Sequence, residues 1–192
     1  MGIKVGYKLF RVMKSRPGEL FPLYVNANQS IPIGKWVKAE CGEVTRNGKV
    51  KSRLGELKFR PGWHINDKVP FVSHIGIKEK GKISYMRNDT VWCKVLYKTD
   101  INYQFDAYQK GYINGKLNVC KACLDYIPEN GFYKYKTNPL MQGEWIISGR
   151  MMVIRVLSDN EVFEICKKNN IISLPRKNKF DYSKFGFALE GV

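Results

Sequence analysis

Val91-Trp92-Cys93-Lys94-Val95-Leu96-Tyr97 is the stretch of sequence that decides the fold. β-Branched and aromatic residues dominate it, and these residue types favour the pleated surface of a sheet over a helix. Lys94 is the only charged residue in the run. We therefore predict a central strand over residues 91–97.

Further runs with the composition or alternation of strands lie on both sides of this segment. A Pro17-Gly18 turn separates the first two runs, and Pro22 places the second at a sheet edge, because proline cannot donate to the ladder. Ser148-Gly149 interrupts the last run, which predicts two strands or one bulged strand. The runs are residues 7–12, 20–25, 35–39, 59–65, 132–137 and 144–157.

Helical signals are fewer. A short helix is predicted over residues 103–110, and a second begins after Ser158, where Glu161 completes a capping box. The sequence thus predicts an α+β fold whose core is strand-dominated and mostly antiparallel, with two or three short helices. We place this single domain at residues 1–172, followed by a basic, aromatic C-terminal tail at 173–192.

The chain is strongly basic. Its 33 Lys and Arg against 17 Asp and Glu give a formal charge of +16. The excess is concentrated in residues 1–60, which hold 13 basic and 4 acidic side chains. Such a charge raises the rate of association with any polyanion. A lysine-rich proteome is the alternative explanation, but it would spread the charge evenly, so nucleic acid is the expected partner.

The sequence also indicates where the protein is located and whether it binds a metal ion. No apolar run approaches the ~20 residues that a membrane span requires, and the N-terminus has no signal-peptide pattern. The five cysteines lack the regular spacing of a disulfide framework, and we expect free thiols. Cys120 and Cys123 have the spacing of half a zinc site, although two partly buried thiols are the preferred interpretation. We expect a cytoplasmic protein with no metal, cofactor or membrane partner, and leave the oligomeric state open.

Asn47-Gly48 is a strong signal for a two-residue hairpin turn. A hairpin here would be exposed and basic, and phosphate groups are the natural partners of such a surface. The predicted nucleic-acid-binding residues of this hairpin are Arg46, Lys49, Lys51 and Arg53.

The segment Lys58-Phe59-Arg60-Pro61-Gly62-Trp63-His64 concentrates the most chemistry. Arg60 is suited to holding a phosphate through two hydrogen bonds, and Trp63 offers a ring on which a base can stack. His64 is suited to proton transfer near neutral pH. The competing interpretation makes Trp63 a core residue, pairs Arg60 with a carboxylate such as Asp67, and gives His64 a structural role.

Residues 132–137 interleave rings with lysines. As a strand they would place Phe132 and Lys134 on one face and Tyr133 and Tyr135 on the other. That arrangement suits a platform for single-stranded nucleic acid, but it is equally typical of a half-buried strand, which is the preferred interpretation.

Signals for an enzyme are sparse, since there are two histidines and no P-loop or Gly-x-Ser-x-Gly motif. The alternative to a binding protein is an enzyme acting on RNA or NAD through Arg60, His64 and Tyr135, similar to a metal-free ribonuclease. An ADP-ribosyltransferase would instead need an early arginine and a late glutamate, for which Arg11 and Glu144 are available.

Several segments together resemble a family found in phages and mobile elements of gut Firmicutes. The similarity covers about residues 7–170, and Arg60-Pro61-Gly62-Trp63-His64 is its most specific part. The other matching segments are residues 91–95, 100–104, 131–139 and 145–149.

The resemblance implies a role for this protein. Small stand-alone phage proteins of this kind include inhibitors of host defence, among them type II anti-CRISPR proteins. By this resemblance we expect a non-enzymatic anti-CRISPR protein that binds target DNA, guide RNA or the nuclease complex, with Cas9 the best candidate. The Cys120 and Cys123 pair does not belong to the family pattern.

Overall fold

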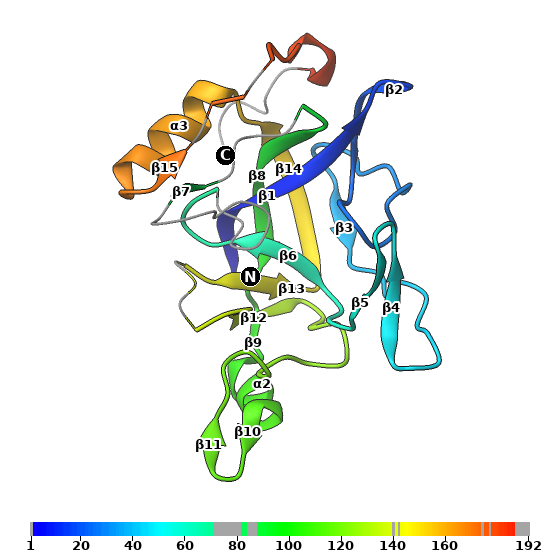
Figure 1. Cartoon of the computed structure of the whole chain (residues 1–192), viewed down its shortest axis with the longest axis vertical. Helices are drawn as coiled ribbons and strands as arrows, with labels where there is room; N and C mark the ends of the chain where they lie inside the picture. The colour runs from blue at the N-terminus through cyan, green and yellow to red at the C-terminus, as the bar shows by residue number, and fades with distance from the viewer. Residues whose placement is uncertain are drawn as a thin grey trace.

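A nine-stranded sheet organises the described part of the chain (Figure 1). The computed structural model describes residues 2–70, 82–83, 88–139, 141, 143–173, 175–176 and 178–186, with the backbone alone at 82, 83 and 172. The strands follow the order β3-β14-β8-β1-β6-β13-β12-β9, and β2 also pairs with β1. These strands are β1 (Ile3–Met13), β2 (Arg16–Phe21), β3 (Trp36–Lys38), β6 (Trp63–Asn66), β8 (Thr90–Lys98), β9 (Ile101–Asn102), β12 (Gly131–Tyr135), β13 (Trp145–Ser148) and β14 (Arg150–Val156).

Three small strand pairs and the helices surround this sheet (Figure 1). The pairs are β4 (Lys49–Ser52) with β5 (Gly55–Lys58), β10 (Tyr112–Ile113) with β11 (Lys116–Leu117), and β7 (Lys82–Ile83) with β15 (Ile172–Ser173). The helices are α2 (Gln104–Gly111), α3 (Asp159–Lys168) and the short 3-10 helix η1 (Ser183–Phe185).

Strand β8 lies at the centre, as its composition predicts. It pairs antiparallel with β1 on one side and with β14 on the other. Trp92 belongs to the first of two hydrophobic clusters, whereas Val91, Cys93 and Val95 belong to the second. Most pairings are antiparallel, apart from the parallel pairs β9–β12 and β7–β15. The α+β class with a strand-dominated core and two α-helices in the described residues is thus confirmed.

Both helices begin near their predicted positions. At the start of α3, the Ser158 hydroxyl accepts a hydrogen bond from the Glu161 amide at 3.3 Å. The Glu161 carboxylate accepts one from the Ser158 amide at 2.8 Å, which completes the predicted capping box. Residues 144–157 form two strands, with Gly149 between β13 and β14.

The first turn of the chain differs from the prediction. Strand β1 continues to Met13 and closes a hairpin through Lys14 and Ser15, because Met13 pairs with Arg16. The Pro17-Gly18 turn is therefore wrong, since both residues lie within β2. Strand β2 then ends at Phe21.

Two hydrophobic clusters cover the two faces of the sheet. On one face, Tyr133, Trp145 and Ile147 pack with residues of α2 and α3. On the other face, Phe10 and Trp63 pack with residues of β8 and β14. The sheet is therefore buried on both sides and gives a rigid support to the loops at its edges.

The sheet opens between β1 and β6. Only Tyr7 and Asn66 are paired between these strands, whereas β6 pairs with β13 over four residues and β1 with β8 over nine. Beyond Tyr7, the two halves of the sheet separate. This opening is where the candidate site lies.

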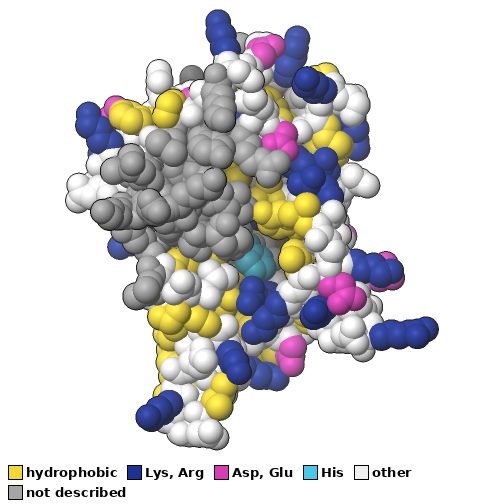
Figure 2. All heavy atoms as spheres, in the orientation of Figure 1, with side chains coloured by type: hydrophobic (Ala, Val, Ile, Leu, Met, Phe, Trp, Pro, Cys, Tyr) yellow, Lys and Arg dark blue, Asp and Glu magenta, His cyan; other side chains and the backbone are white. Residues whose placement is uncertain are grey.

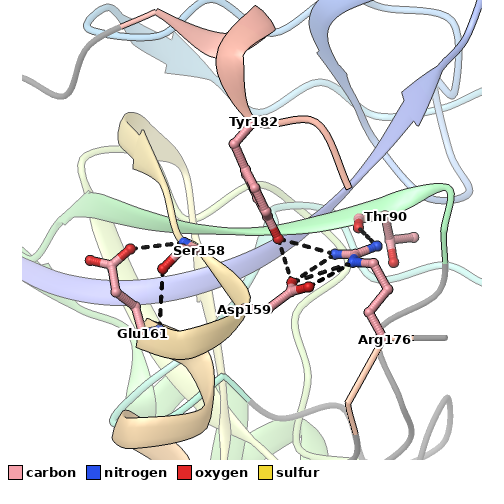
Figure 3. A network of polar contacts seen from close by, with 6 residues as sticks. All are labelled: Thr90, Ser158, Asp159, Glu161, Arg176 and Tyr182. Atoms are coloured by element: carbon pink, nitrogen blue, oxygen red, sulfur yellow. Dashed lines mark hydrogen bonds and ion pairs between the residues drawn. The ribbon is translucent and has the colours of Figure 1, made fainter. Parts of the chain in front are cut away.

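The last described residues pack onto the body of the protein (Figure 3). Arg176 donates to both Asp159 carboxylate oxygens, at 3.1 and 3.2 Å, and to the Thr90 carbonyl at 2.9 Å. Tyr182 also donates to Asp159, and Phe185 belongs to the second hydrophobic cluster. The described part of the segment after residue 172 thus contributes to the core, which its basic and aromatic composition does not reveal.

Candidate functional site

The turn predicted at Asn47-Gly48 exists, because Val44 and Val50 on either side of it form an antiparallel bridge. The basic hairpin also has a second turn. Strands β4 and β5 pair from Lys49–Lys58 to Ser52–Gly55, so the chain reverses at Arg53 and Leu54. Asn47 and Gly48 form an earlier turn, in which the Gly48 amide donates to the Thr45 carbonyl at 3.0 Å. The hairpin extends from one side of the molecule (Figure 1).

All four predicted hairpin residues are exposed. Lys49 pairs with Glu56 at 3.7 Å, Lys51 pairs with Glu43, and the Arg53 Nε donates to the Leu23 carbonyl at 3.3 Å. Arg46 makes no hydrogen bond or ion pair with the described residues. Exposed ion pairs contribute only ~0–1 kcal/mol, so the paired lysines remain able to exchange a glutamate for a phosphate.

The turn in the Arg60–His64 segment depends on Gly62. This residue has φ +128, and a Cβ there would lie 2.5 Å from the Ile147 side chain. Any larger residue would therefore be strained and would clash with β13. Gly62 thus allows the chain to enter β6 directly from the loop.

Trp63 belongs to the core. Its side chain is buried, and the indole Nε1 donates to the Val37 carbonyl at 3.1 Å. Trp63 lines the cavity described below, but its ring is almost fully enclosed and lies under the Lys8 ammonium, so we leave it out of the exposed candidate interface. The interpretation of Trp63 as a core residue is the one that the structure supports.

Arg60 does not pair with Asp67, because Asp67 pairs with Lys134 at 3.1 Å. The guanidinium lies instead 4.7 Å from the centre of the Tyr135 ring. The Arg60 Nε and the Tyr135 hydroxyl are both buried and have no hydrogen-bond partner among the described residues. A cation–π contact thus holds the Arg60 guanidinium in place, and its Nε–H remains able to donate a hydrogen bond.

A cavity of about 420 Å³ lies beside this segment. Strands β1 and β6, the hairpin, and the loops around residues 22–29 and 39–42 form its walls. Lys58, Arg60 and His64 all line it. Figure 2 shows exposed hydrophobic side chains (yellow) near the histidine (cyan), and lysines and arginines (dark blue) on the side where Figure 1 places β4 and β5.

Lys8 is the residue of this site that sequence reasoning missed. It reaches across the opening in the sheet, and its Nζ donates to the His64 carbonyl at 2.9 Å. The same ammonium lies 5.5 Å from the ring centres of both Phe10 and Trp63. Burial lowers the pKa of Lys8 to about 8. The polar positions of the alternating run 7–12 were the only signal, and they do not show that Lys8, rather than Arg11, faces a cavity.

The three residues of the enzyme alternative do not line one cavity. His64 packs edge-on against Trp145 at 5.9 Å, and its Nδ1 lies 3.2 Å from the Gly62 carbonyl. Tyr135 is buried outside the lining of this cavity, and burial raises its pKa to about 12. A phenol with such a pKa is a poor proton acceptor at neutral pH. Arg60 and His64 alone share the cavity.

The residues considered for ADP-ribosyl transfer are engaged elsewhere. Arg11 lies over the Phe21 ring at 5.7 Å and donates to the Ala27 carbonyl. Glu144 pairs with Lys134 at 3.2 Å. Neither residue lines the cavity.

The remaining predicted features are structural. Tyr133 and Tyr135 on β12 are buried, so the predicted alternation is correct but both rings face the core. Cys120 and Cys123 are free thiols. Among the described residues, no three His, Cys, Asp or Glu side chains lie close enough together to hold a metal ion. The helices of the described residues also lack the length and apolarity of a membrane-spanning helix.

Comparisons with known proteins do not extend this description. The chain matches no protein-family model, no curated protein and no solved structure at a significant level. Its function must therefore be inferred from the geometry and charge of the chain itself.

Proposed function

We propose that this protein binds nucleic acid through the hairpin β4–β5 and the residues next to it. The observation that supports this proposal is the charge of residues 43–60, which contain six Lys and Arg against two Glu. Both glutamates are paired with hairpin lysines. Arg46 and Lys58 are exposed and make no ion pair with described residues, so they present two uncompensated charges to solvent.

The physics of such a surface favours phosphate. Cations that replace the counterions of a nucleic acid gain free energy from ion release, and this gain falls steeply with salt. Contacts of lysine and arginine with phosphate groups set affinity and position without sequence preference. We therefore expect the hairpin to bind DNA and RNA of any sequence.

The experiment that tests this proposal is a salt series with labelled duplex DNA and RNA. The variant Arg46→Glu/Lys58→Glu should weaken binding at least about tenfold and reduce the salt slope by about 2, since each phosphate contact contributes about 0.9. The matched control is Lys116→Glu/Lys121→Glu, which makes the same charge change at exposed positions in and after β11. Equal weakening in the two variants would show that net charge, and not the hairpin, governs binding.

We further propose that binding serves to block a nucleic-acid-guided defence nuclease, with Cas9 the first candidate. The support is the resemblance carried by residues 60–64 together with the basic hairpin. An equimolar amount of the protein should then inhibit cleavage of target DNA by guide-loaded Cas9, and the hairpin variant should inhibit less. Full cleavage in the presence of the protein would reject Cas9 as the target. It would not affect the proposal of nucleic-acid binding, which the salt series tests separately.

An enzyme acting on RNA or NAD is the second candidate, because Arg60 and His64 line one cavity. It predicts turnover: cut RNA, or NAD converted to nicotinamide, each lost in His64→Ala. Intact RNA and NAD after prolonged incubation with the wild-type protein would reject this candidate.

A further inference from the structure

The opening between β1 and β6 leaves a cavity of a size suited to a small ligand. Its volume of about 420 Å³ lies within the ~300–1,000 Å³ range of ligand pockets. This volume is too small for a stacked duplex. A nucleotide that enters must therefore be free or must come from an unpaired strand.

Lys8 supplies a partly buried positive charge in this cavity. Among the described residues, its only hydrogen bond goes to the His64 carbonyl, and no carboxylate lies within ion-pair distance. An ammonium has three N–H donors, so two remain after the bond to His64. Enclosing a charge without an opposite charge is unfavourable, and an anionic ligand group would relieve this cost.

The other charged groups of the lining strengthen the positive potential. Arg60 and Lys58 line the cavity along with Lys8, and Glu40 is the single carboxylate of the described lining. The Arg60 Nε is buried and has no hydrogen-bond partner among the described residues. The remaining titratable groups of the lining are His64, Cys41 and Tyr24.

The rest of the lining is mostly apolar. Such walls suit a planar, weakly hydrated body such as a nucleobase, while the cations suit its phosphate. The apolar lining residues include Leu23, Val25, Leu54, Leu57, Phe59 and Trp145.

We propose that this cavity binds one nucleotide unit, a phosphate with an unstacked base, and that Lys8 contacts the phosphate. The inference rests on the proposed nucleic-acid binding and narrows it to single strands or free nucleotides. It also assigns Lys8 a role in binding, whereas the proposed binding by the basic hairpin does not involve Lys8.

The test measures binding of adenosine 5′-monophosphate, adenosine, inorganic phosphate and a short oligo-dA by calorimetry. Lys8→Met should weaken binding of the monophosphate at least about tenfold, the effect of one charge-assisted hydrogen bond, and should leave adenosine binding unchanged. Lys4→Met is the matched control, because Lys4 lies exposed on the same strand, 5.7 Å from the Phe132 ring, and does not line the cavity.

These four ligands distinguish a free nucleotide from a nucleotide that belongs to a single strand. Lys8-dependent binding of the monophosphate supports a free nucleotide, and Lys8-dependent binding of oligo-dA alone supports a strand. Inorganic phosphate that binds as tightly as the monophosphate would overturn the inference, since the base would then contribute nothing. Binding of none of these probes in a Lys8-dependent way would also overturn it, while the hairpin variant tests the proposed function separately.

A second measurement covers the case in which Lys8→Met does not fold. In the wild-type protein, the monophosphate should protect Lys8 from an amine-directed reagent and leave Lys4 unprotected, as mass spectrometry of the labelled peptides would show. Equal labelling of Lys8 with and without the nucleotide would contradict the proposed contact.

Discussion

Replacing Arg176 by methionine removes a guanidinium and keeps a side chain of similar length. In the folded protein, this guanidinium binds both oxygens of Asp159 and the Thr90 carbonyl, and lies 4.6 Å from the Phe180 ring centre. The Arg176 side chain is 2% exposed and that of Asp159 is 32% exposed. The change thus leaves a partly buried carboxylate without its main cation.

The expected loss follows from this burial. Removing one partner of a buried ion pair costs about 3–5 kcal/mol. Asp159 is partly solvated and lies in the first turn of α3, where the helix dipole favours a negative charge, so we expect the lower end, about 3 kcal/mol. For a protein of this size, that loss lowers Tm by about 6–12 °C.

Urea unfolding followed by circular dichroism measures this loss, with Arg155→Met as the control. Arg155, on β14, pairs at 2.6 Å with Glu161, which lies in the same helical turn as Asp159, but both side chains are about one-third exposed. The control should therefore lose about 1 kcal/mol or less. If Arg176→Met costs no more than Arg155→Met, the segment after residue 172 does not stabilise the domain and the reasoning fails.

Three further predictions concern the helix cap and the cavity. Ser158→Ala removes the cap of α3 and should cost about 1 kcal/mol in urea unfolding; a loss no larger than that of an exposed substitution such as Lys116→Ala would contradict the capping argument. Nucleotide affinity should fall as pH rises through about 8, because Lys8 loses its proton there, whereas Lys8→Arg should keep its affinity to higher pH; parallel profiles would show that Lys8 does not carry the charge. His64→Ala should retain nucleic-acid binding at the hairpin, since His64 lies on β6; a tenfold loss in anisotropy titrations would place His64 in that interface.

The sequence predicted the fold best where local and tertiary preferences agree. Residues 91–97 combine high β propensity with an apolar run that only Lys94 interrupts, and they form the central strand β8. Ser158 and Glu161 carry a cap that needs only neighbouring residues. The turn after β1 was misplaced because Pro17 and Gly18 are strong local turn formers, whereas the pairing of Met13 with Arg16 depends on the register of the hairpin.

The candidate site was predicted only in part. The segment 58–64 was identified from its residue types, and the structure places it at the cavity wall. Lys8 could not be identified, because its role depends on where the pairing of β1 with β6 stops. The burial of Trp63 against Val37 likewise depends on contacts between distant segments.

The long pairing of β1 with β8 also determines when the protein can fold. Ile3 pairs with Lys98 and Arg11 with Thr90, so the longest pairing of the first strand cannot form until about half of the chain has been synthesised, although the short hairpin with β2 can form earlier. Contacts between such distant residues slow folding, because the loop between them must close first. On the ribosome, the basic N-terminal third therefore emerges before its sheet exists, and its lysines and arginines meet ribosomal RNA before they meet any intended partner.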